Sequence, residues 1–354
     1  MTQNPKILRR GWTTGACATA ATKAALMALW GNGFPDVVSI TLPKGETPDF
    51  DVVNTQVGPG WCEVGIIKDA GDDPDVTHGC EVRVRVAAII SGTDGTGGVQ
   101  FKAGAGVGIV TKPGLPIAVG EPAINPKPRE MMTDVVKQIA DHFGQPADVE
   151  ITISIVNGAA LALKTWNPRL GIKGGLSVLG TTGVVRPFSC SAWIASIHRG
   201  VDVARATGTK HVAGCTGATS EATVQKHYDL PDHAMLDMGD FAGGLLKYLR
   251  RHPVARLTLG GGIGKITKLA QGAVDLHSGR SQVDFAALVK MTGDARLSGV
   301  NTALEAYEIA GKSMADLVAK TALTTVRDVL RTADMQVDII IIDRAGYIIA
   351  KASE

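Results

Sequence analysis

The sequence predicts a mixed α/β protein of two domains, an α+β N-terminal part followed by a Rossmann-like, mostly parallel sheet with helices on both faces. The chain has 354 residues, a length that favours two domains over one. Short alternating segments fill 37–120, whereas a repeated order of strand, glycine turn and helix follows residue 148. We therefore expect domains over 1–147 and 148–354, and leave open whether the last strand returns to the first domain.

In the first domain, helices are expected at two places. After Thr13 and Thr14, which can cap a helix, the alanine-rich stretch TTGACATAATKAALMALWGNG predicts a helix with unusually small side chains. Such side chains suit either close approach of a ligand or, more commonly, close packing on a sheet. The stretch NPKPREMMTDVVKQIADHFG predicts a proline-rich loop and an amphipathic helix that ends at Gly144. Between them, alternating segments such as EVRVRVAAIIS, over 81–91, predict strands.

In the second domain, a strand is expected over 148–158 and a strand with a short hairpin over 335–350. Between them lie three strand–turn–helix stretches, whose glycine turns are GTTG at 180–183, GCTG at 214–217 and GGGIG at 260–264. Ligands bind to open α/β sheets outside the carboxyl ends of the strands, where backbone amides and helix N-termini are exposed. The sequence therefore predicts that the three turns gather at one ligand crevice.

The turn at 260–264 does not match either of the common nucleotide-binding patterns. A P-loop would need glycine at Leu259 and a hydroxyl side chain at Ile266, and the dinucleotide pattern would need a third glycine where Lys265 stands. What remains is an open backbone before a helix, with one cation beside it. This predicts an anion site but not a triphosphate site.

Composition excludes several classes of protein. The chain is 45% hydrophobic and 20% charged, and its net charge of +2 gives no reason to expect a nucleic-acid surface. Its five cysteines are widely spaced without a C-x-x-C pair, which is typical of reduced thiols in the cytoplasm. The stretch MTQNPKILRRG lacks the apolar core of a signal peptide, and VDIIIID is too short to span a membrane. We expect a cytoplasmic protein without a bound metal or a membrane segment.

Two polar stretches have alternative interpretations. KDAGDDPDVTHG, at 68–79, carries four aspartates that could bind a cation or ribose hydroxyls, although an Asx-rich turn is the commoner cause. His277 lies in a loop and is a weak candidate for a catalyst, since no G-x-S-x-G or H-E-x-x-H pattern accompanies it. No protein nucleophile is identified. The residues alone thus suit a reaction in which the protein mainly positions an activated cosubstrate.

Five stretches together resemble the CbiD family of cobalt-precorrin-5B C(1)-methyltransferases. They occur in the family's order over residues 8–278, and their joint match is specific. They are LRRGWTTGACATAATKAAL, DAGDDPDVTHG, GAGVGIVTKPGLPIAVGEPAINPKPREMM, NPRLGIKGGLSVLGTTGVVRPFS and GKITKLAQGAVDLHS. The resemblance implies methylation of carbon 1 of a corrin precursor in cobalamin biosynthesis, with S-adenosylmethionine as the methyl donor.

From this resemblance and the clustered cations we assign roles as hypotheses. A donor-binding role is expected for Thr181, Thr182, Gly183, Gly260, Gly262 and Gly264, with the GAGVG stretch at 104–108 as an alternative donor loop. Substrate binding is expected for Thr13, Thr14, Arg129, Arg169, Lys173, Arg186, Lys265 and Lys268, the cations pairing with carboxylates of the tetrapyrrole.

Several alternatives stay open at this point. The rival functions are a non-catalytic tetrapyrrole carrier, which would not bind S-adenosylmethionine, and a nucleotide-dependent oxidoreductase, which would contain bound NAD(P). Neither a cobalt-containing nor a metal-free substrate is excluded, and a homo-oligomer is as compatible with the sequence as a monomer.

Overall fold

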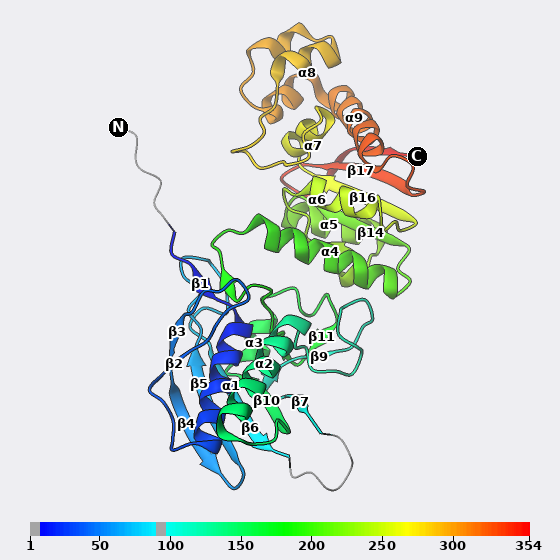
Figure 1. Cartoon of the computed structure of the whole chain (residues 1–354). Coiled ribbons are helices and arrows are strands. Elements are labelled where there is room, and N and C mark those ends of the chain that lie inside the picture. Colours follow the sequence, from blue (N-terminus) through cyan, green and yellow to red (C-terminus); the bar gives the residue numbers. More distant parts are fainter. Residues whose placement is uncertain (1–7, 90–96) are drawn as a thin grey trace, which may run out of the picture. The chain divides into compact units, whose positions relative to one another are not determined.

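The computed structural model describes residues 8–89 and 97–354. The chain divides into two compact units, Met1–Ser189 (unit 1) and Cys190–Glu354 (unit 2) (Figure 1). The division therefore falls after Ser189 and not near residue 148. The reason is that β10 (Val149–Ile155) pairs antiparallel with β6 (Glu81–Ala88) and parallel with β7 (Val99–Ala103), which makes it an inner strand of the first sheet.

Unit 1 is built on a five-stranded sheet in the order β4-β5-β6-β10-β7, antiparallel except for the β10–β7 pair. Along β10 every second residue from Val149 to Ile155 is buried, as the alternating sequence requires. The expected strand over 81–91 ends at Ala88, and its residues 90 and 91 lie outside the described part of the chain. The other strands of the sheet are β4 (Val53–Gly58), β5 (Trp61–Ile67), β6 (Glu81–Ala88) and β7 (Val99–Ala103).

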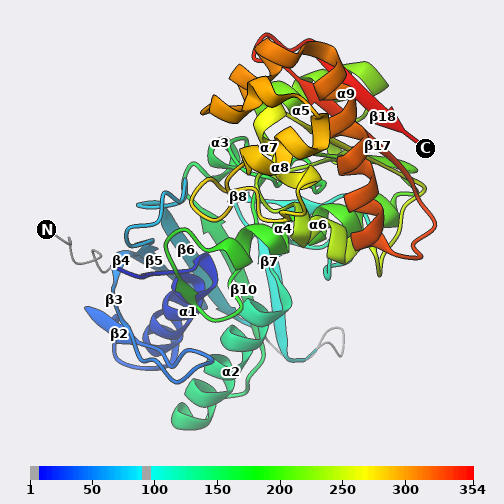
Figure 2. The same ribbon diagram turned by 90° about the horizontal axis from the view of Figure 1, so that it is seen from above.

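Two long helices pack in unit 1. The helix α1 (Thr14–Trp30) is buried over most of its surface and packs on β5, β6 and α2 (Figure 2). Its small side chains are thus accounted for by close packing within unit 1. The helix α2 (Pro126–Phe143) ends at Gly144 in the left-handed conformation, as predicted. Its start differs from the prediction, because the prolines expected in a loop before the helix lie in its first turn, directly after Asn125.

Short pairs of strands complete unit 1. They connect loops that are far apart in the sequence, such as β1 (Gly11–Trp12) with β13 (Val184–Val185). The remaining short elements are β2 (Val37–Ser39) with β3 (Asp49–Asp51), β8 (Gly106–Val107) with β12 (Gly175–Leu176), β9 (Ile109–Val110) with β11 (Ile172–Lys173), and α3 (Gly158–Ala162).

Unit 2 has a second five-stranded sheet in the order β15-β14-β16-β17-β18. Its first four strands are parallel and β18 is antiparallel to β17, so the chain's last strand stays in unit 2. The strands are β15 (Met235–Leu236), β14 (His211–Cys215), β16 (Arg256–Gly261), β17 (Gln336–Ile342) and β18 (Ile348–Ser353). Together the two units confirm the predicted mixed α/β class.

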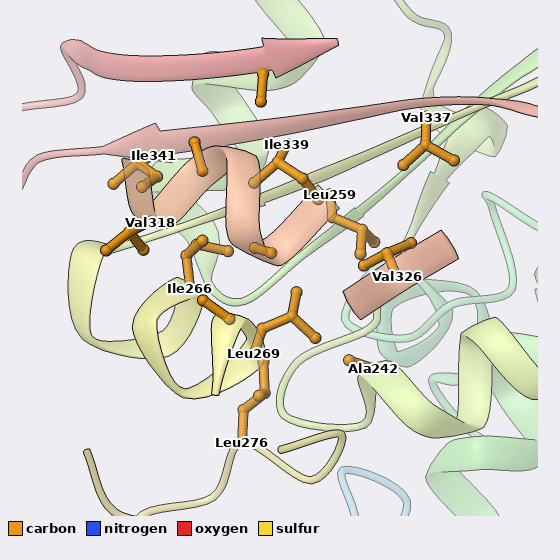
Figure 3. Packing of buried hydrophobic residues seen from close by; sticks show 14 of the residues in the cluster. Ala242, Leu259, Ile266, Leu269, Leu276, Val318, Val326, Val337, Ile339 and Ile341 are labelled. Atoms are coloured by element: carbon orange, nitrogen blue, oxygen red, sulfur yellow. The ribbon is translucent and has the colours of Figure 1, made fainter. Parts of the chain in front are cut away.

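Helices cover both faces of this second sheet. On β17, Ile340 and Ile342 join the apolar cluster that includes Val224 of α5, whereas Ile339 and Ile341 join the larger cluster formed with α7 and α9. Figure 3 shows Ile266 and Leu269 of α7 near residues of α9 and β17 in that larger cluster. The helices are α4 (Cys190–Ala206), α5 (Ala218–Tyr228), α6 (Ala242–Leu249), α7 (Ile263–Ala270), α8 (Phe285–Thr292) and α9 (Ala303–Leu330). Within the described ranges, none of the helices is long and apolar enough to cross a membrane.

Candidate functional site

Three segments of unit 1 meet at the N-terminus of α1. The Trp12 amide donates to the Asp69 carbonyl oxygen (2.7 Å), and the Thr13 amide donates to the Gly183 carbonyl oxygen (2.9 Å). The Thr13 hydroxyl caps α1 by accepting from the Ala16 amide at 3.2 Å. One structural cluster is therefore formed by three stretches that are separate motifs in the sequence, near residues 12, 69 and 183.

Glycines allow these segments to approach closely. A Cβ atom on Gly11 would lie 2.1 Å from the Ala70 carbonyl carbon, and one on Gly180, whose φ is +134°, would lie 2.2 Å from the Thr13 hydroxyl. The GTTG turn thus lies in unit 1 and packs against the start of α1, whereas the other two glycine turns lie in unit 2. Thr181 is exposed, and the Thr182 hydroxyl accepts from the Val184 amide within its own turn.

The glycines of the GAGVG stretch, at 104–108, are also explained in part by close packing. A Cβ atom on Gly104 would lie 2.1 Å from the Ser154 hydroxyl oxygen, and one on Gly106 would lie 2.0 Å from the Ile155 carbonyl oxygen. Both neighbours belong to β10. Packing against the sheet of unit 1 is therefore sufficient to require glycine at these two positions.

The acidic loop at 68–79 is an Asx-rich turn whose carboxylates accept hydrogen bonds from backbone amides of this chain. Asp69 accepts from the Gly71 amide and Asp75 from the Thr77 amide, within the loop itself. Asp72 accepts from the Arg9 amide at 2.8 Å, and Asp73 accepts from the Phe188 amide at 2.8 Å. The loop therefore ties the N-terminal segment to the segment after β13. Over the part of the chain that the structure describes, no cluster of His, Cys, Asp and Glu fits a metal ion.

A buried cation, Lys68, anchors this loop, and it was not among the predicted site residues. The Lys68 side chain is 1% exposed, and its ammonium nitrogen lies 2.7 Å from an Asp75 carboxylate oxygen. Burial by itself raises the pKa of Asp75, but Lys68 and Thr77 outweigh burial and hold this pKa below its usual value. Burial also raises the pKa of Cys17 to about 12 and that of Cys80 to about 11, so both thiols are unreactive at neutral pH.

The predicted basic residues of unit 1 have different surroundings. The Arg129 guanidinium donates to the Ile124 carbonyl oxygen (2.9 Å) and the Pro122 carbonyl oxygen (3.2 Å), so it holds the loop before α2. The Arg169 guanidinium lies 4.7 Å from the centre of the Trp166 ring. Lys173 and Arg186 are exposed, with Lys173 in β11 and Arg186 directly after β13. Arg186 therefore directly follows the strand that pairs with β1, just before the start of α1.

In unit 2, the turns after β14 and β16 are neighbours at the carboxyl edge of the parallel sheet. Cys215 pairs with Gly260 across the two strands. A Cβ atom on Gly261 would lie 2.8 Å from the Thr216 hydroxyl oxygen, but one on Gly262 would meet nothing closer than 3.9 Å and one on Gly217 nothing within 4 Å. Neither Gly217 nor Gly262 has a left-handed backbone. Packing and backbone geometry therefore leave these two glycines unexplained, and space is open beside them.

Gly217 was not among the predicted site residues. The GCTG stretch marks a turn, but the sequence cannot distinguish a glycine that packing requires from one that it does not. Gly264, which was predicted, lies within α7, and a Cβ atom there would be 3.9 Å from the Ala303 Cβ atom.

The predicted lysines after the GGGIG turn already have partners within unit 2. The Lys265 ammonium group pairs with Asp240 and donates to the Leu276 carbonyl oxygen at 2.9 Å. Lys268 donates to the same carbonyl oxygen at 3.1 Å, and burial followed by the charge of Lys265 lowers its pKa. His277 is exposed, and its Nδ1 accepts from the Gly279 amide at 3.1 Å. Both lysines thus hold the loop in which His277 lies.

A cavity of about 680 Å³ opens at the other edge of the second sheet, beside His211 and Arg256 at the starts of β14 and β16. Two arginines that line this cavity already form ion pairs. The Arg256 guanidinium lies 2.7 Å from the Asp338 carboxylate, and Arg327 pairs with Glu354. Ligands of parallel sheets bind at the carboxyl edge. We therefore place the candidate site at the edge with Gly217 and Gly262, and not in this cavity.

The structure thus defines a mixed α/β protein, with a glycine-lined sheet edge in unit 2 and exposed cations in unit 1. Within that class, the chain belongs to the CbiD family. The CbiD family model matches residues 1–187, and that of the CbiD C-terminal domain matches residues 275–353.

Two relatives are similar over almost the whole chain, and both are named cobalt-precorrin-5B C(1)-methyltransferase. The protein from Brucella anthropi is 58% identical, with 97% of this chain and 95% of the relative covered. That from Paramagnetospirillum magneticum is 55% identical, with 98% of each covered. A solved structure of the cobalamin biosynthesis protein CbiD from Archaeoglobus fulgidus is 26% identical, has a TM-score of 0.42 and covers 77% of this chain and 83% of that one.

Proposed function

We propose that this chain transfers a methyl group from S-adenosylmethionine to carbon 1 of precorrin-5B or its cobalt complex, producing the corresponding precorrin-6A for cobalamin biosynthesis. The observation that carries this proposal is the identity of 55% or more with near-full-length relatives named for that reaction. A nucleotide-dependent oxidoreductase has no comparable support.

The open edge of unit 2 fits the methyl donor. Gly217 and Gly262 leave room where any other residue would place a Cβ atom, and each lies at the start of a helix of eight residues or more. Exposed amides at such positions favour carboxylates, and S-adenosylmethionine carries one on its methionine part. We propose that the donor lies here, with Gly260 and Gly264 in the same turn. A donor-binding role for Thr181, Thr182 and Gly183 in unit 1 stays a prediction.

Unit 1 is the part that we propose for the tetrapyrrole. The macrocycle carries acetate and propionate carboxylates, for which guanidinium and ammonium groups are suitable partners. Arg169, Lys173 and Arg186 belong to unit 1, with Lys173 in β11 and Arg186 directly after β13. Thr13 and Thr14, at the start of α1, are buried, so substrate binding by these two threonines stays a prediction. Arg129, Lys265 and Lys268 were predicted for the same role, but each has partners within its own unit, so substrate binding by these three stays a prediction.

In the proposed reaction the protein mainly positions the two reactants and need not supply a reactive side chain. Bound S-adenosylmethionine supplies an activated methyl group, and the electron-rich ring carbon is the nucleophile. The chain's residues must hold the two reactants about 3–3.5 Å apart and in line, and must keep water away. No side chain is needed as a nucleophile, which agrees with the raised pKa values of Cys17, Cys80 and Cys215. His277 stays a weak candidate for a catalyst.

The test is transfer of an isotope-labelled methyl group from S-adenosylmethionine to precorrin-5B, with and without cobalt. Mass spectrometry and NMR then identify the methylated carbon. A label on carbon 1 is the expected result, and its dependence on cobalt would identify the natural substrate. Binding of the macrocycle without any affinity for S-adenosylmethionine would instead support a non-catalytic carrier.

A further inference from the structure

Phe188 has an unusual combination of exposure and backbone conformation. Its side chain is 66% exposed, although it is a large aromatic residue. Its φ is +55°, and the other described non-glycine residues with positive φ are Asn54, Asn157, Asp229 and Arg331. Asparagine and aspartate tolerate that region, whereas a bulky aromatic residue there is strained. Strain of this kind persists when surrounding contacts hold it, and it is typical of ligand-binding positions.

The contacts that hold Phe188 come from two other parts of unit 1. Its amide donates to the Asp73 carboxylate at 2.8 Å. The loop that carries Asp73 is fixed from within by the buried Lys68–Asp75 pair at 2.7 Å. It is fixed from outside by Asp72, which accepts from the Arg9 amide at 2.8 Å. The backbone of Phe188 is thus held in place while its ring stays exposed.

The neighbours of Phe188 have the chemistry of one kind of ligand. Arg186 is two residues earlier and exposed, and β13 directly before it pairs with β1 at the start of α1. Leu179, at the other end of the same segment, is 51% exposed, and its carbonyl oxygen accepts from the Gly15 amide in α1. A segment that presents apolar surface, an aromatic ring and a guanidinium group suits a ligand with a broad apolar face and carboxylates at its rim.

We propose that Phe188 stacks on a face of the tetrapyrrole ring system and positions the substrate of this chain. This inference rests on the proposed function, since it takes the tetrapyrrole as the substrate. Phe188 acts as a positioning and specificity-determining residue for the methyl acceptor. The Asp73 carboxylate holds the backbone of Phe188 in its left-handed conformation. Stacking contributes through the apolar area that the ring and the macrocycle bury together.

The test compares Phe188→Gly, Phe188→Ala and Phe188→Trp, because glycine removes the ring and relieves the backbone strain. In Phe188→Gly we expect the KM for precorrin-5B to rise roughly ten-fold, the KM for S-adenosylmethionine to change less than two-fold, and the Tm to stay level or rise. Phe188→Ala should lose the same affinity, with a Tm close to that of the wild-type protein and below that of Phe188→Gly because alanine keeps the backbone strain. Phe188→Trp should keep near-normal affinity. Leu163→Ala is the matched control, since Leu163 is 78% exposed in the same unit.

The outcomes separate this inference from the proposed function. If the wild-type protein methylates carbon 1 and Phe188→Gly has an unchanged KM for precorrin-5B, stacking by Phe188 is wrong and the proposed function stands. Equal losses for both ligands, or a lower Tm in Phe188→Gly, would show that the ring packs within the protein and would also overturn the inference. A wild-type protein that neither binds the macrocycle nor transfers methyl would overturn both.

Discussion

The ammonium nitrogen of Lys68 and a carboxylate oxygen of Asp75 lie 2.7 Å apart, and the lysine side chain is 1% exposed. A buried charge is costly unless it is paired, so each of these residues depends on the other. The pair joins two residues of the acidic loop. Other aspartates of this loop accept hydrogen bonds from the amides of Arg9 and Phe188. The stability of the loop and the placement of the proposed substrate residues are therefore connected.

Replacing Lys68 should destabilise the protein. In Lys68→Met the Asp75 carboxylate would be left partly buried without its cation, and we expect a loss of about 2–4 kcal/mol in the free energy of unfolding. Urea unfolding at pH 7 measures it. Lys312→Met is the control, because Lys312 and Asp316 form an exposed pair, and there we expect a change within about 0.5 kcal/mol. Similar losses in the two variants would contradict a special role for the buried pair.

The effect of Lys68→Met should depend on pH. Lys68 holds the pKa of Asp75 below its usual 3.8 against the effect of burial, so the wild-type pair stabilises the fold above that pH and weakens as the pH falls through the lowered pKa. Without Lys68, burial of Asp75 is opposed only by Thr77, so its pKa lies higher than in the wild-type protein and protonation relieves the variant at a higher pH. The difference in unfolding free energy between the two proteins should therefore narrow below about pH 5. A difference that is constant from pH 7 to pH 4 would argue against this electrostatic cause.

Substitutions at the glycines of the carboxyl edge of the second sheet should weaken the affinity for S-adenosylmethionine without lowering the stability of the protein. Gly262→Ser adds a good capping residue in open space, so we expect unchanged or slightly raised stability and at least a roughly ten-fold weaker affinity for S-adenosylmethionine. We expect the same stability and the same loss of donor affinity in Gly217→Ser. Calorimetric titration with the donor and a thermal melt measure the two quantities.

The control for these variants is Gly261→Ser. Its Cβ atom would lie 2.8 Å from the Thr216 hydroxyl oxygen, and we expect it to cost about 1–3 kcal/mol of stability. Normal donor affinity in both Gly217→Ser and Gly262→Ser would move the donor site away from this edge.

Two arginines of unit 1 should respond differently to substitution. Arg186 is exposed directly after β13, and Arg186→Ala should raise the KM for the tetrapyrrole roughly ten-fold with little effect on the KM for the donor or on stability. Arg129 donates to two carbonyl oxygens before α2, so Arg129→Ala should lower stability by about 1–2 kcal/mol. Steady-state kinetics with each substrate and thermal melts test both. If Arg186→Ala weakens both ligands equally, its assignment to the tetrapyrrole is wrong.

Local signals allowed much of the fold to be predicted. The end of α2 follows from Gly144, because capping depends on a few neighbouring residues. The order of strand, turn and helix over 211–228 and 256–270 follows from a buried apolar run, glycines and a helical stretch. In each case the residues that decide the structure are close together in the sequence.

Partners that are far apart in the sequence could not be predicted in this way. The strand Val149–Ile155 alternates like any half-buried strand, and its sequence does not say which sheet it joins. It pairs with β6 and β7, which moves the boundary between the units to Ser189. The GTTG turn resembles a turn between strand and helix, but a contact with Thr13 places it at the start of α1.

By itself, the sequence determined the α/β class, the aspartate-rich turn and the order of motifs typical of the family, because local propensity and motif spacing carry these. The tertiary structure decided which glycines are required by packing and which, such as Gly217 and Gly262, are not. It also decided that Lys265 and Lys268 bind the Leu276 carbonyl, and that Asp73 holds Phe188. These depend on contacts between distant segments, since burial and hydrogen-bond partners are fixed when the chain packs and not by a residue's neighbours in sequence.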